Sequence, residues 1–423
     1  MREWLLLSVV VLAVPLAFRF TWVAVLLWTW ISLMNPHKLT YGLASMAPLA
    51  AIAAGAALVS LPFNRNRWNN LLQPAVLALL LLLGWMGLTT VLAINPEASA
   101  QQLSKVLKIQ LMTLLAMVAL TERRHIHWFV WANVLSIGFY GFKGGLFTIA
   151  TGGEFHVWGP PGGFIEGNNE LALALVMVLP LMNYLRLQSP QRGLRVGLLL
   201  LMGLTVVAVA GSQSRGAFLA VLAMAGMLWL RSHHKGLAGL AMGLASCAVL
   251  ALMPDAWEQR MHSIQTYEAD GSAMGRINAW QTTANIARHH LTGGGFDIYT
   301  PETFARYAPD PSNVLVAHSI YFSVLGEHGY IGLALFLLVW VLALRLSGQI
   351  AAHAGAQPPL AWARHLALMC QVALVGYAVG GAFLSLAYFD LPYNLLVMLV
   401  VTRALVPQPQ GRAQRLRAVA PGP

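Results

Sequence analysis

The sequence contains few charged residues and almost no cysteine. Only 10% of its 423 residues are Asp, Glu, Lys or Arg, and two are cysteine, Cys247 and Cys370. So low a charge excludes an ordinary soluble domain, in which about 25% of residues are charged. Because both cysteines lie within apolar runs, they provide neither a disulfide framework nor a zinc site, and we expect them to pack as small apolar side chains.

Aspartate is especially scarce, which bears on metal binding. The five aspartates form no Asp-x-Asp pair; they are Asp255, Asp270, Asp297, Asp310 and Asp390. Magnesium and manganese sites usually draw on carboxylate oxygens. His289 and His290 are adjacent and would point in different directions on a helix, which disfavours zinc. We therefore expect a protein that needs neither a metal ion nor another cofactor.

Apolar runs, in contrast, fill most of the chain, and 58% of its residues are hydrophobic. Many of the runs are long enough to cross about 30 Å of hydrocarbon as a helix. The sequence predicts an all-α, polytopic integral membrane protein with about twelve transmembrane helices. The expected spans are residues 4–34, 43–61, 74–93, 104–120, 125–149, 168–187, 195–211, 214–231, 236–253, 318–346, 363–388 and 391–406. Because Pro15 and Phe18-Arg19-Phe20 interrupt the first, it is either one bent span or two short ones.

One long polar stretch divides the chain. It predicts four segments: N-terminal transmembrane helices (1–253), a large cap loop (254–317), C-terminal transmembrane helices (318–406) and a basic tail (407–423). The cap carries more acids than bases and no lysine. Its acids are Asp255, Glu258, Glu268, Asp270, Asp297, Glu302 and Asp310, and its bases are Arg260, Arg276, Arg288 and Arg306.

The arginines indicate the orientation of the chain in the membrane. If the expected spans alternate, one face collects Arg65, Arg67, Arg123, Arg124, Arg186, Arg192, Arg195, Arg231, Lys235, Arg345 and the basic tail. The positive-inside rule makes that face cytoplasmic and places the cap outside. The N-terminus is then inside if 4–34 crosses once and outside if it crosses twice. The net charge of +11 thus follows from topology, and we expect no nucleic-acid partner.

Polar residues from distant parts of the sequence fall on the cap side. Asn168, Asn169 and Glu170 begin one span, and Arg215 begins another within the turn Gly211-Ser-Gln-Ser-Arg-Gly216. His318 opens the helix that follows the cap. A titratable imidazole at the border between water and lipid suits chemistry on a lipid-borne substrate.

Four motifs in this region resemble those of one family, the O-antigen ligase and polymerase superfamily. They are Gly163-Phe-Ile-Glu-Gly-Asn-Asn-Glu-Leu-Ala172, Gly211-Ser-Gln-Ser-Arg-Gly-Ala-Phe-Leu219, Gly275-Arg-Ile-Asn-Ala-Trp280 with Leu291-Thr-Gly-Gly-Gly-Phe296, and His318-Ser-Ile-Tyr-Phe-Ser-Val-Leu-Gly-Glu-His-Gly329. The resemblance covers roughly residues 160–340 in order and spacing. The N-terminal segment Trp28–Gly42 is further similar to exosortase-associated O-glycosylation ligases.

The resemblance implies a lipopolysaccharide O-antigen ligase, a glycosyltransferase of the bacterial inner membrane. Such an enzyme transfers a glycan from undecaprenyl pyrophosphate to a hydroxyl of lipid A–core at the periplasmic face, among membrane lipids. Arg215 and Arg276 would bind the donor diphosphate, since guanidinium matches phosphate oxygens bidentately. His318 would be the catalytic base, and the displacement would invert the anomeric carbon. Further possible substrate-binding residues are Asn168, Asn169, Glu170, Tyr321 and Trp280.

Three alternatives remain open at this point. A polymerase of the same superfamily would extend the glycan on its carrier, and a protein O-glycan ligase would use another acceptor. A lipid or glycan transporter is the third, but the sequence shows no internal repeat of the kind that transporters often contain. Within the helix of His318, Glu327 is either a functional acid or a packing residue. Gly293-Gly-Gly295 is expected to be a turn that returns the cap to the membrane rather than a phosphate cradle.

Overall fold

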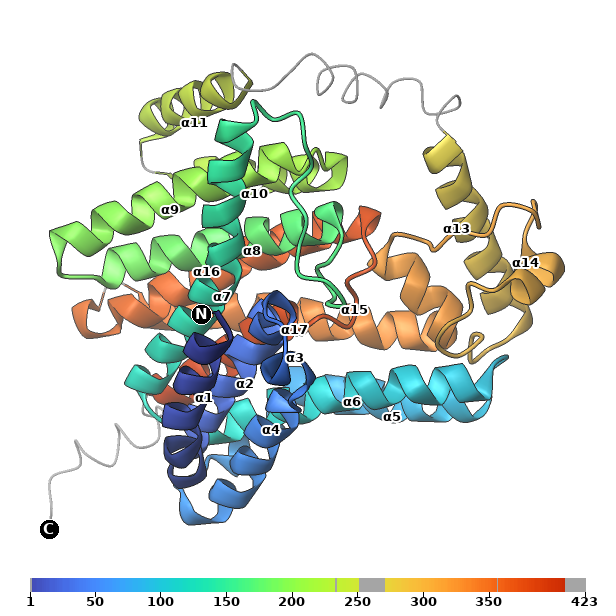
Figure 1. Ribbon diagram of the computed structural model, residues 1–423, viewed down its shortest axis with the longest axis horizontal. Helices are drawn as coiled ribbons and strands as arrows, with labels where there is room; N and C mark the ends of the chain where they lie inside the picture. Colours follow the sequence, from blue (N-terminus) through green and yellow to red (C-terminus); the bar gives the residue numbers. More distant parts are fainter. Residues whose placement is uncertain (1, 233, 251–270, 356, 408–423) are drawn as a thin grey trace, which may run out of the picture.

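The computed structural model describes residues 2–232, 234–250, 271–355 and 357–407, and these form helices and no strands (Figure 1). The first helices are α1 (Arg2–Arg19), α2 (Thr21–Met34), α3 (Leu43–Met46), α4 (Leu49–Ser60), α5 (Pro74–Val91), α6 (Pro96–Ala119) and α7 (Arg123–Ala150). The next are α8 (Asn168–Gln188), α9 (Arg192–Gly211), α10 (Arg215–Arg231), α11 (Lys235–Leu250), α13 (Gly271–His289) and α14 (Pro301–Tyr307). The last are α15 (Ile320–Ala354), α16 (Ala361–Gly380) and α17 (Asp390–Leu405). The all-α fold class is thereby confirmed.

Six helical segments are long and apolar enough to cross a membrane, counted within the described residues. They are Pro74–Val91, Pro96–Ala119, Asn168–Gln188, Arg192–Gly211, Ile320–Ala354 and Pro358–Phe383. Shorter apolar helices add to them at Leu6–Arg19, Thr21–Met34 and Leu49–Phe63. In a bilayer every backbone polar group must be bonded internally, and a helix achieves this within one segment. The architecture is therefore that of a polytopic membrane protein.

The N-terminal run 4–34 forms two helices. The backbone is extended at Phe20 (φ −128°, ψ 112°), which separates α1 from α2, whereas Pro15 lies inside α1. The helices α1, α2 and α4 pack against one another, and α2 joins this group to α7. Of the two arrangements considered for 4–34, the structure therefore contains the pair of short helices.

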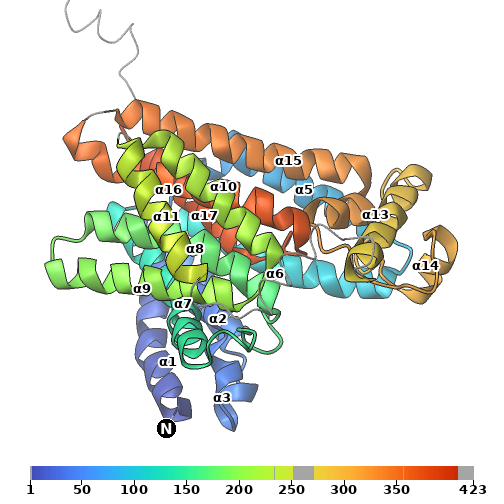
Figure 2. The same ribbon diagram turned by 90° about the horizontal axis from the view of Figure 1, so that it is seen from above.

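The loops expected on the cap side do come together. A backbone hydrogen bond of 2.8 Å joins Ile94, after α5, to Gly294 in the cap. The α7–α8 loop reaches the α9–α10 turn, where the Gln213 side chain donates to the Gly153 carbonyl at 3.1 Å. Figures 1 and 2 show α13 and α14 gathered at the N-terminal end of α15. These segments build one continuous polar region around the start of α15.

The arginine-bearing loops meet in a separate region. The Arg67 backbone N–H donates to Val118 O, and its guanidinium donates to Ala404 O, both at 2.9 Å. Arg123 donates to the side chain of Gln188 at 3.3 Å, which joins the start of α7 to the end of α8. The described arginine loops therefore separate from the cap-side loops as alternating spans require. The predictions for the basic tail, which carries Arg412, Arg415 and Arg417, and for residues 254–270 of the cap concern residues outside the described ranges.

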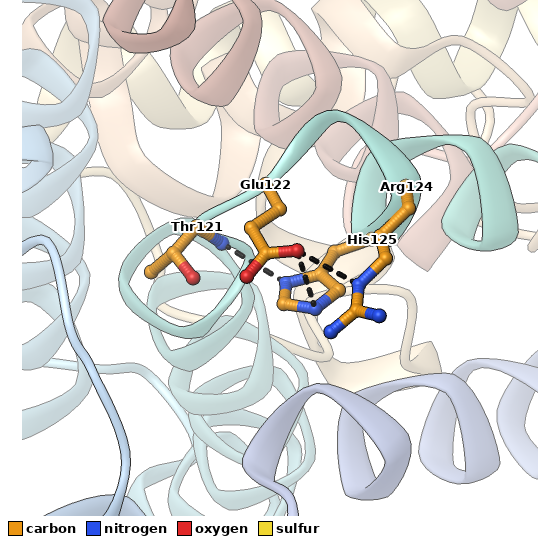
Figure 3. A network of polar contacts seen from close by, with 4 residues as sticks. All are labelled: Thr121, Glu122, Arg124 and His125. Carbon is orange, nitrogen blue, oxygen red and sulfur yellow. Dashed lines mark hydrogen bonds and ion pairs between the residues drawn. The ribbon is translucent and has the colours of Figure 1, made fainter.

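A small polar network stabilises the start of α7 in this arginine-bearing region (Figure 3). Arg124 forms an ion pair of 2.7 Å with Glu122. His125 accepts a hydrogen bond from the Thr121 N–H at 3.3 Å, and its ring stacks on Trp22 of α2. Because Glu122 precedes the first helical residue, its carboxylate also faces the positive end of the helix dipole.

Two helices after the cap differ from the expected spans 318–346 and 363–388. The first begins at Ile320, and His318 precedes it in a left-handed conformation (φ 44°). It also continues to Ala354, so Arg345 lies within α15 and not in a loop. The second ends at Gly380, and residues 384–389 return without α-helix. That stretch is apolar because it is buried: Leu386, Ala387 and Phe389 are each about 2% exposed or less.

A backbone break at Gly329 divides α15, and the cap occupies the break. Gly329 has φ 67° and ψ −171°, which is not helical. The N–H groups of Gly294 and Gly295 donate to the carbonyls of Gly326 and Glu327, both at 2.8 Å. The carbonyl groups just before the break therefore bond to the glycine-rich turn of the cap. This turn returns the cap to the membrane helices, as expected.

We expect Gly329→Ala to destabilise the protein by at least about 1–3 kcal/mol, because its backbone conformation is essentially restricted to glycine. A Cβ there would also lie 2.2 Å from the Leu291 carbonyl oxygen. Gly348→Ala in the same helix is the matched control, since nothing lies within 4 Å of its added Cβ. It should be neutral or stabilising by up to about 1 kcal/mol. Thermal unfolding in detergent measures both, and equal stability of the two variants would contradict the role of the break.

Candidate active site

His318 lies in the short segment without helix between the cap and α15. Ala317 before it is fully buried, and its carbonyl accepts a hydrogen bond of 2.7 Å from the Trp280 indole. Burial, together with the positive charge of Arg276, lowers the pKa of His318 to about 4. Its Nδ1 is buried without a hydrogen-bond partner among the described residues. The imidazole is therefore neutral at pH 7 and has a nitrogen available to accept a proton.

Arg215 and Arg276 line a single cavity of about 310 Å³. Its other lining residues are Gly216, Leu219, Ala273, Ile277, Trp280 and Phe383. Arg276 and Trp280 are four residues apart on α13 and so share one face of that helix. Two arginines from helices far apart in sequence thus line one pocket that has an aromatic wall, and guanidinium groups suit a multiply charged anion.

A tight turn positions Arg215 as the first residue of α10. Gln213 adopts a left-handed conformation (φ 56°), and the Ser214 side chain caps the helix by accepting from the Ala217 N–H at 3.3 Å. The small residues of the 211–216 motif therefore serve the geometry of the turn. They place the guanidinium at the positive end of a helix, where anions are favoured.

The start of α8 supports this turn. Asn168 is buried, and its side chain donates to the Ser212 carbonyl at 2.8 Å. Asn169 donates to the side chain of Asn168 at 3.4 Å. Glu170 lies within electrostatic range of Arg276. Asn168 and Asn169 thus bond to the protein in this structure, whereas Glu170 interacts electrostatically with Arg276, one of the two arginines of the cavity.

Tyr321 and Trp280 also have internal partners. The Tyr321 hydroxyl donates to the Ala378 carbonyl at 2.7 Å, which ties α15 to α16. Trp280 stacks on Phe322 with ring centroids 4.9 Å apart and planes 6° apart. Of the residues singled out in the sequence, the structure brings Arg215, Arg276 and Trp280 into one cavity. It places His318 beside them, outside the lining itself.

A second cavity, of about 350 Å³, was not predicted from the sequence. It is lined by Ala98, Gln101, Gln102 and Lys105 of α6, by Phe164, by Asp297, Tyr299 and Val316 of the cap, by Ser323 and Glu327 of α15, and by Ser385, Ala387 and Tyr388. Four lining residues of α6 recur at helical spacing, and three are polar. That pattern in an apolar helix was the available signal, because polar side chains in membrane helices are commonly functional.

The glycine-rich turn is not a phosphate cradle in this structure. The N–H groups of Gly293, Gly294 and Gly295 donate to backbone carbonyls at 3.0, 2.8 and 2.8 Å. They are therefore already engaged. In the described part of the chain, no three His, Cys, Asp or Glu residues are grouped so that they could hold a metal ion.

The pKa of His318 predicts how activity depends on pH, if its imidazole is the base. An ordinary histidine would be half protonated near pH 6.5. Because the pKa of His318 is lowered to about 4, the base remains neutral and competent above that value. We expect kcat/KM to stay flat through pH 6.5 and to fall only as pH approaches 4. A pH–rate profile that loses half its activity near pH 6.5 would contradict this.

Comparison with known families matches two parts of the chain. Residues 172–337 match the model of a family described as O-antigen ligase, and residues 1–189 match a family of unknown function. The O-antigen ligase match supports membership of the O-antigen ligase/polymerase superfamily. The matched O-antigen ligase segment contains Arg215, Arg276, Trp280 and His318. No curated protein matches the sequence.

The match to this family indicates the general type of protein. It indicates a membrane enzyme of the ligase or polymerase type, which acts on a lipid-linked glycan. The family is one of the bacterial inner membrane, and several apolar helices agree with a multi-pass protein of this kind.

Proposed function

We propose that this member of the superfamily is an O-antigen ligase. It transfers O-antigen polysaccharide from undecaprenyl pyrophosphate to a hydroxyl of the lipid A–core acceptor at the periplasmic face of the inner membrane. The observation that supports this most is the cavity lined by Arg215 and Arg276 next to a neutral, half-buried His318.

The proposed reaction is a single displacement. The acceptor oxygen attacks the anomeric carbon and gives its proton to His318, while the bond from that carbon to the diphosphate oxygen breaks. Undecaprenyl pyrophosphate leaves with the electron pair, and the two guanidinium groups stabilise its charge. One displacement without a covalent intermediate inverts the anomeric carbon. The diphosphate is already a good leaving group, so no strong general acid is needed.

A deletion strain tests the proposal against its nearest alternatives. A ligase defect should abolish polymer-bearing lipid A–core while unattached polymer remains on the lipid carrier. A polymerase defect would leave single repeat units attached to the core. Loss of glycan from protein, with intact lipopolysaccharide, would identify a protein O-glycan ligase, as the N-terminal similarity to exosortase-associated enzymes suggests.

Orientation and metal independence are tested on the protein itself. In a variant in which Cys247 and Cys370 are replaced by Ala, a membrane-impermeant thiol reagent should label Glu302→Cys from the periplasm. Gln191→Cys, in the arginine-bearing region, should react only after permeabilisation. Purified enzyme should keep its activity in excess EDTA. Labelling in the reverse pattern would overturn the periplasmic site, and strict dependence on Mg²⁺ or Mn²⁺ would overturn the metal-free mechanism.

A further inference from the structure

The second cavity is a cleft with an open mouth and a buried floor. Gln101, Lys105 and Asp297 are exposed at the mouth, whereas Glu327 and Tyr388, each 7% exposed, form the floor. On the floor the Tyr388 hydroxyl donates to a Glu327 carboxylate oxygen at 2.5 Å. The cleft therefore opens to the polar cap side and ends at a carboxylate that is held in place.

The lining of the cleft has the chemistry of a carbohydrate site. The side-chain amides of Gln101 and Gln102 can each donate and accept hydrogen bonds, and the carboxyl group of Glu327 has two oxygen atoms that can accept them. Planar groups of this kind can bond to two adjacent hydroxyl groups of a sugar ring. Phe164, Tyr299 and Tyr388 add aromatic surface for the apolar face of a sugar. The buried Ser385 hydroxyl lacks a hydrogen-bond partner among the described residues. A bound polar molecule or a water molecule can supply the hydrogen bond that this hydroxyl lacks.

The charge of the lining restricts what binds. It contains one acid and one base at the exposed mouth, Asp297 and Lys105, and a buried acid, Glu327, on the floor. None of the three forms a salt bridge within the described part of the chain. The lining therefore offers no surplus positive charge to a phosphorylated or acidic sugar, in contrast to the cavity that contains Arg215 and Arg276.

The two cavities flank the segment that carries His318. Val316 and Ser323, which lie on either side of His318 in the chain, line the cleft. Ala317 bonds to Trp280, which lines the arginine cavity. In a displacement with inversion, the attacking hydroxyl and the leaving diphosphate lie on opposite sides of the anomeric carbon. A base between the two cavities fits an acceptor in one and a diphosphate in the other.

We propose that this cleft binds the acceptor, through the hydroxyl groups of an uncharged sugar unit at its receiving end. The inference rests on the proposed function, since it assigns the second substrate of the same reaction. Gln101, Gln102 and Glu327 are then acceptor-binding residues, and the mouth between α6 and the cap is the entrance for the acceptor.

Sugar binding is tested without any transfer reaction. Full-length protein in detergent is titrated with methyl glycosides of glucose and N-acetylglucosamine, and with glucose 6-phosphate, by saturation-transfer NMR. We expect the neutral glycosides to bind more tightly than the phosphate. Gln101→Leu should weaken their binding by roughly threefold to tenfold, the usual range for one hydrogen bond. Gln191→Leu is the matched control and should leave binding unchanged.

The second measurement tests whether the acidic residues of the lining cause the preference for neutral glycosides. The double variant Asp297→Asn/Glu327→Gln should narrow or remove the difference between neutral glycoside and glucose 6-phosphate. Glu327→Gln keeps an acceptor oxygen for Tyr388, so the floor is preserved. Tighter binding of the phosphate by the wild type would overturn the proposal, as would an absence of glycoside binding or an equal response of Gln101→Leu and its control.

The arginine variants separate this inference from the proposed function. Arg276→Ala should leave glycoside binding intact. If it abolishes glycoside binding while Gln101→Leu does not, the sugar lies in the arginine cavity and the cleft assignment falls, with the ligase proposal unaffected. If glycosides bind in the cleft but the deletion strain shows no ligation defect, the proposed function fails and the acceptor assignment fails with it.

Discussion

Replacing His318 with alanine is expected to lower transfer by about 10²–10⁴-fold, the usual contribution of a positioned proton acceptor. The imidazole is neutral because burial and Arg276 lower its pKa to about 4, so no other group has to deprotonate it first. The measurement is glycan transfer by purified enzyme with saturating donor. Near-normal activity of the variant would remove this residue from the mechanism.

A second variant guards this test against misfolding. His318 has a left-handed backbone (φ 44°), which asparagine adopts more readily than most residues. His318→Asn should therefore fold as well as the wild type and still be inactive. His234→Ala, at an exposed position in the α10–α11 connection, is the matched control and should retain full activity.

Replacing either cavity arginine with lysine is expected to weaken donor binding by roughly 10- to 100-fold. Hydrogen bonds to charged groups contribute about 1.5–3 kcal/mol each, and lysine keeps the charge but loses the bidentate fork. Binding of undecaprenyl pyrophosphate to Arg215→Lys and Arg276→Lys measures the effect. Arg306→Lys in the exposed part of α14 should bind as the wild type does. Donor binding that survives Arg215→Ala and Arg276→Ala together would exclude these residues from diphosphate recognition.

The sequence was sufficient to predict most of the helices and to single out three residues that line one cavity. A bilayer requires long apolar helices, so composition alone predicts them. Arg215, Arg276 and Trp280 belong to local motifs, and the structure does bring them to one pocket. The left-handed backbone of His318 was not predictable, because it depends on how Ala317 is buried beneath Trp280.

The cleft escaped the sequence analysis for a different reason. Its lining comes from α6, the α7–α8 loop, the cap, the start of α15 and residues 385–388, and the polar residues of α6 show only one side of it. Residues 384–388 were assigned to a transmembrane span because this stretch is mostly apolar, whereas its apolar residues are buried inside the protein. The role of Glu327 was inferred only from its position along the helix. That position shows neither its hydrogen bond with Tyr388 nor the backbone break at Gly329.

The bonding of the glycine-rich turn into the break of α15 also constrains how the enzyme opens and closes. Lifting the turn would leave the buried carbonyls of Gly326 and Glu327 without their partners, at a cost of about 1–3 kcal/mol for each group. The turn and the first part of α15 therefore move as one rigid unit. Substrates can enter through the open mouth of the cleft, and long glycans can come and go while the base, the cleft floor and the turn keep their mutual positions.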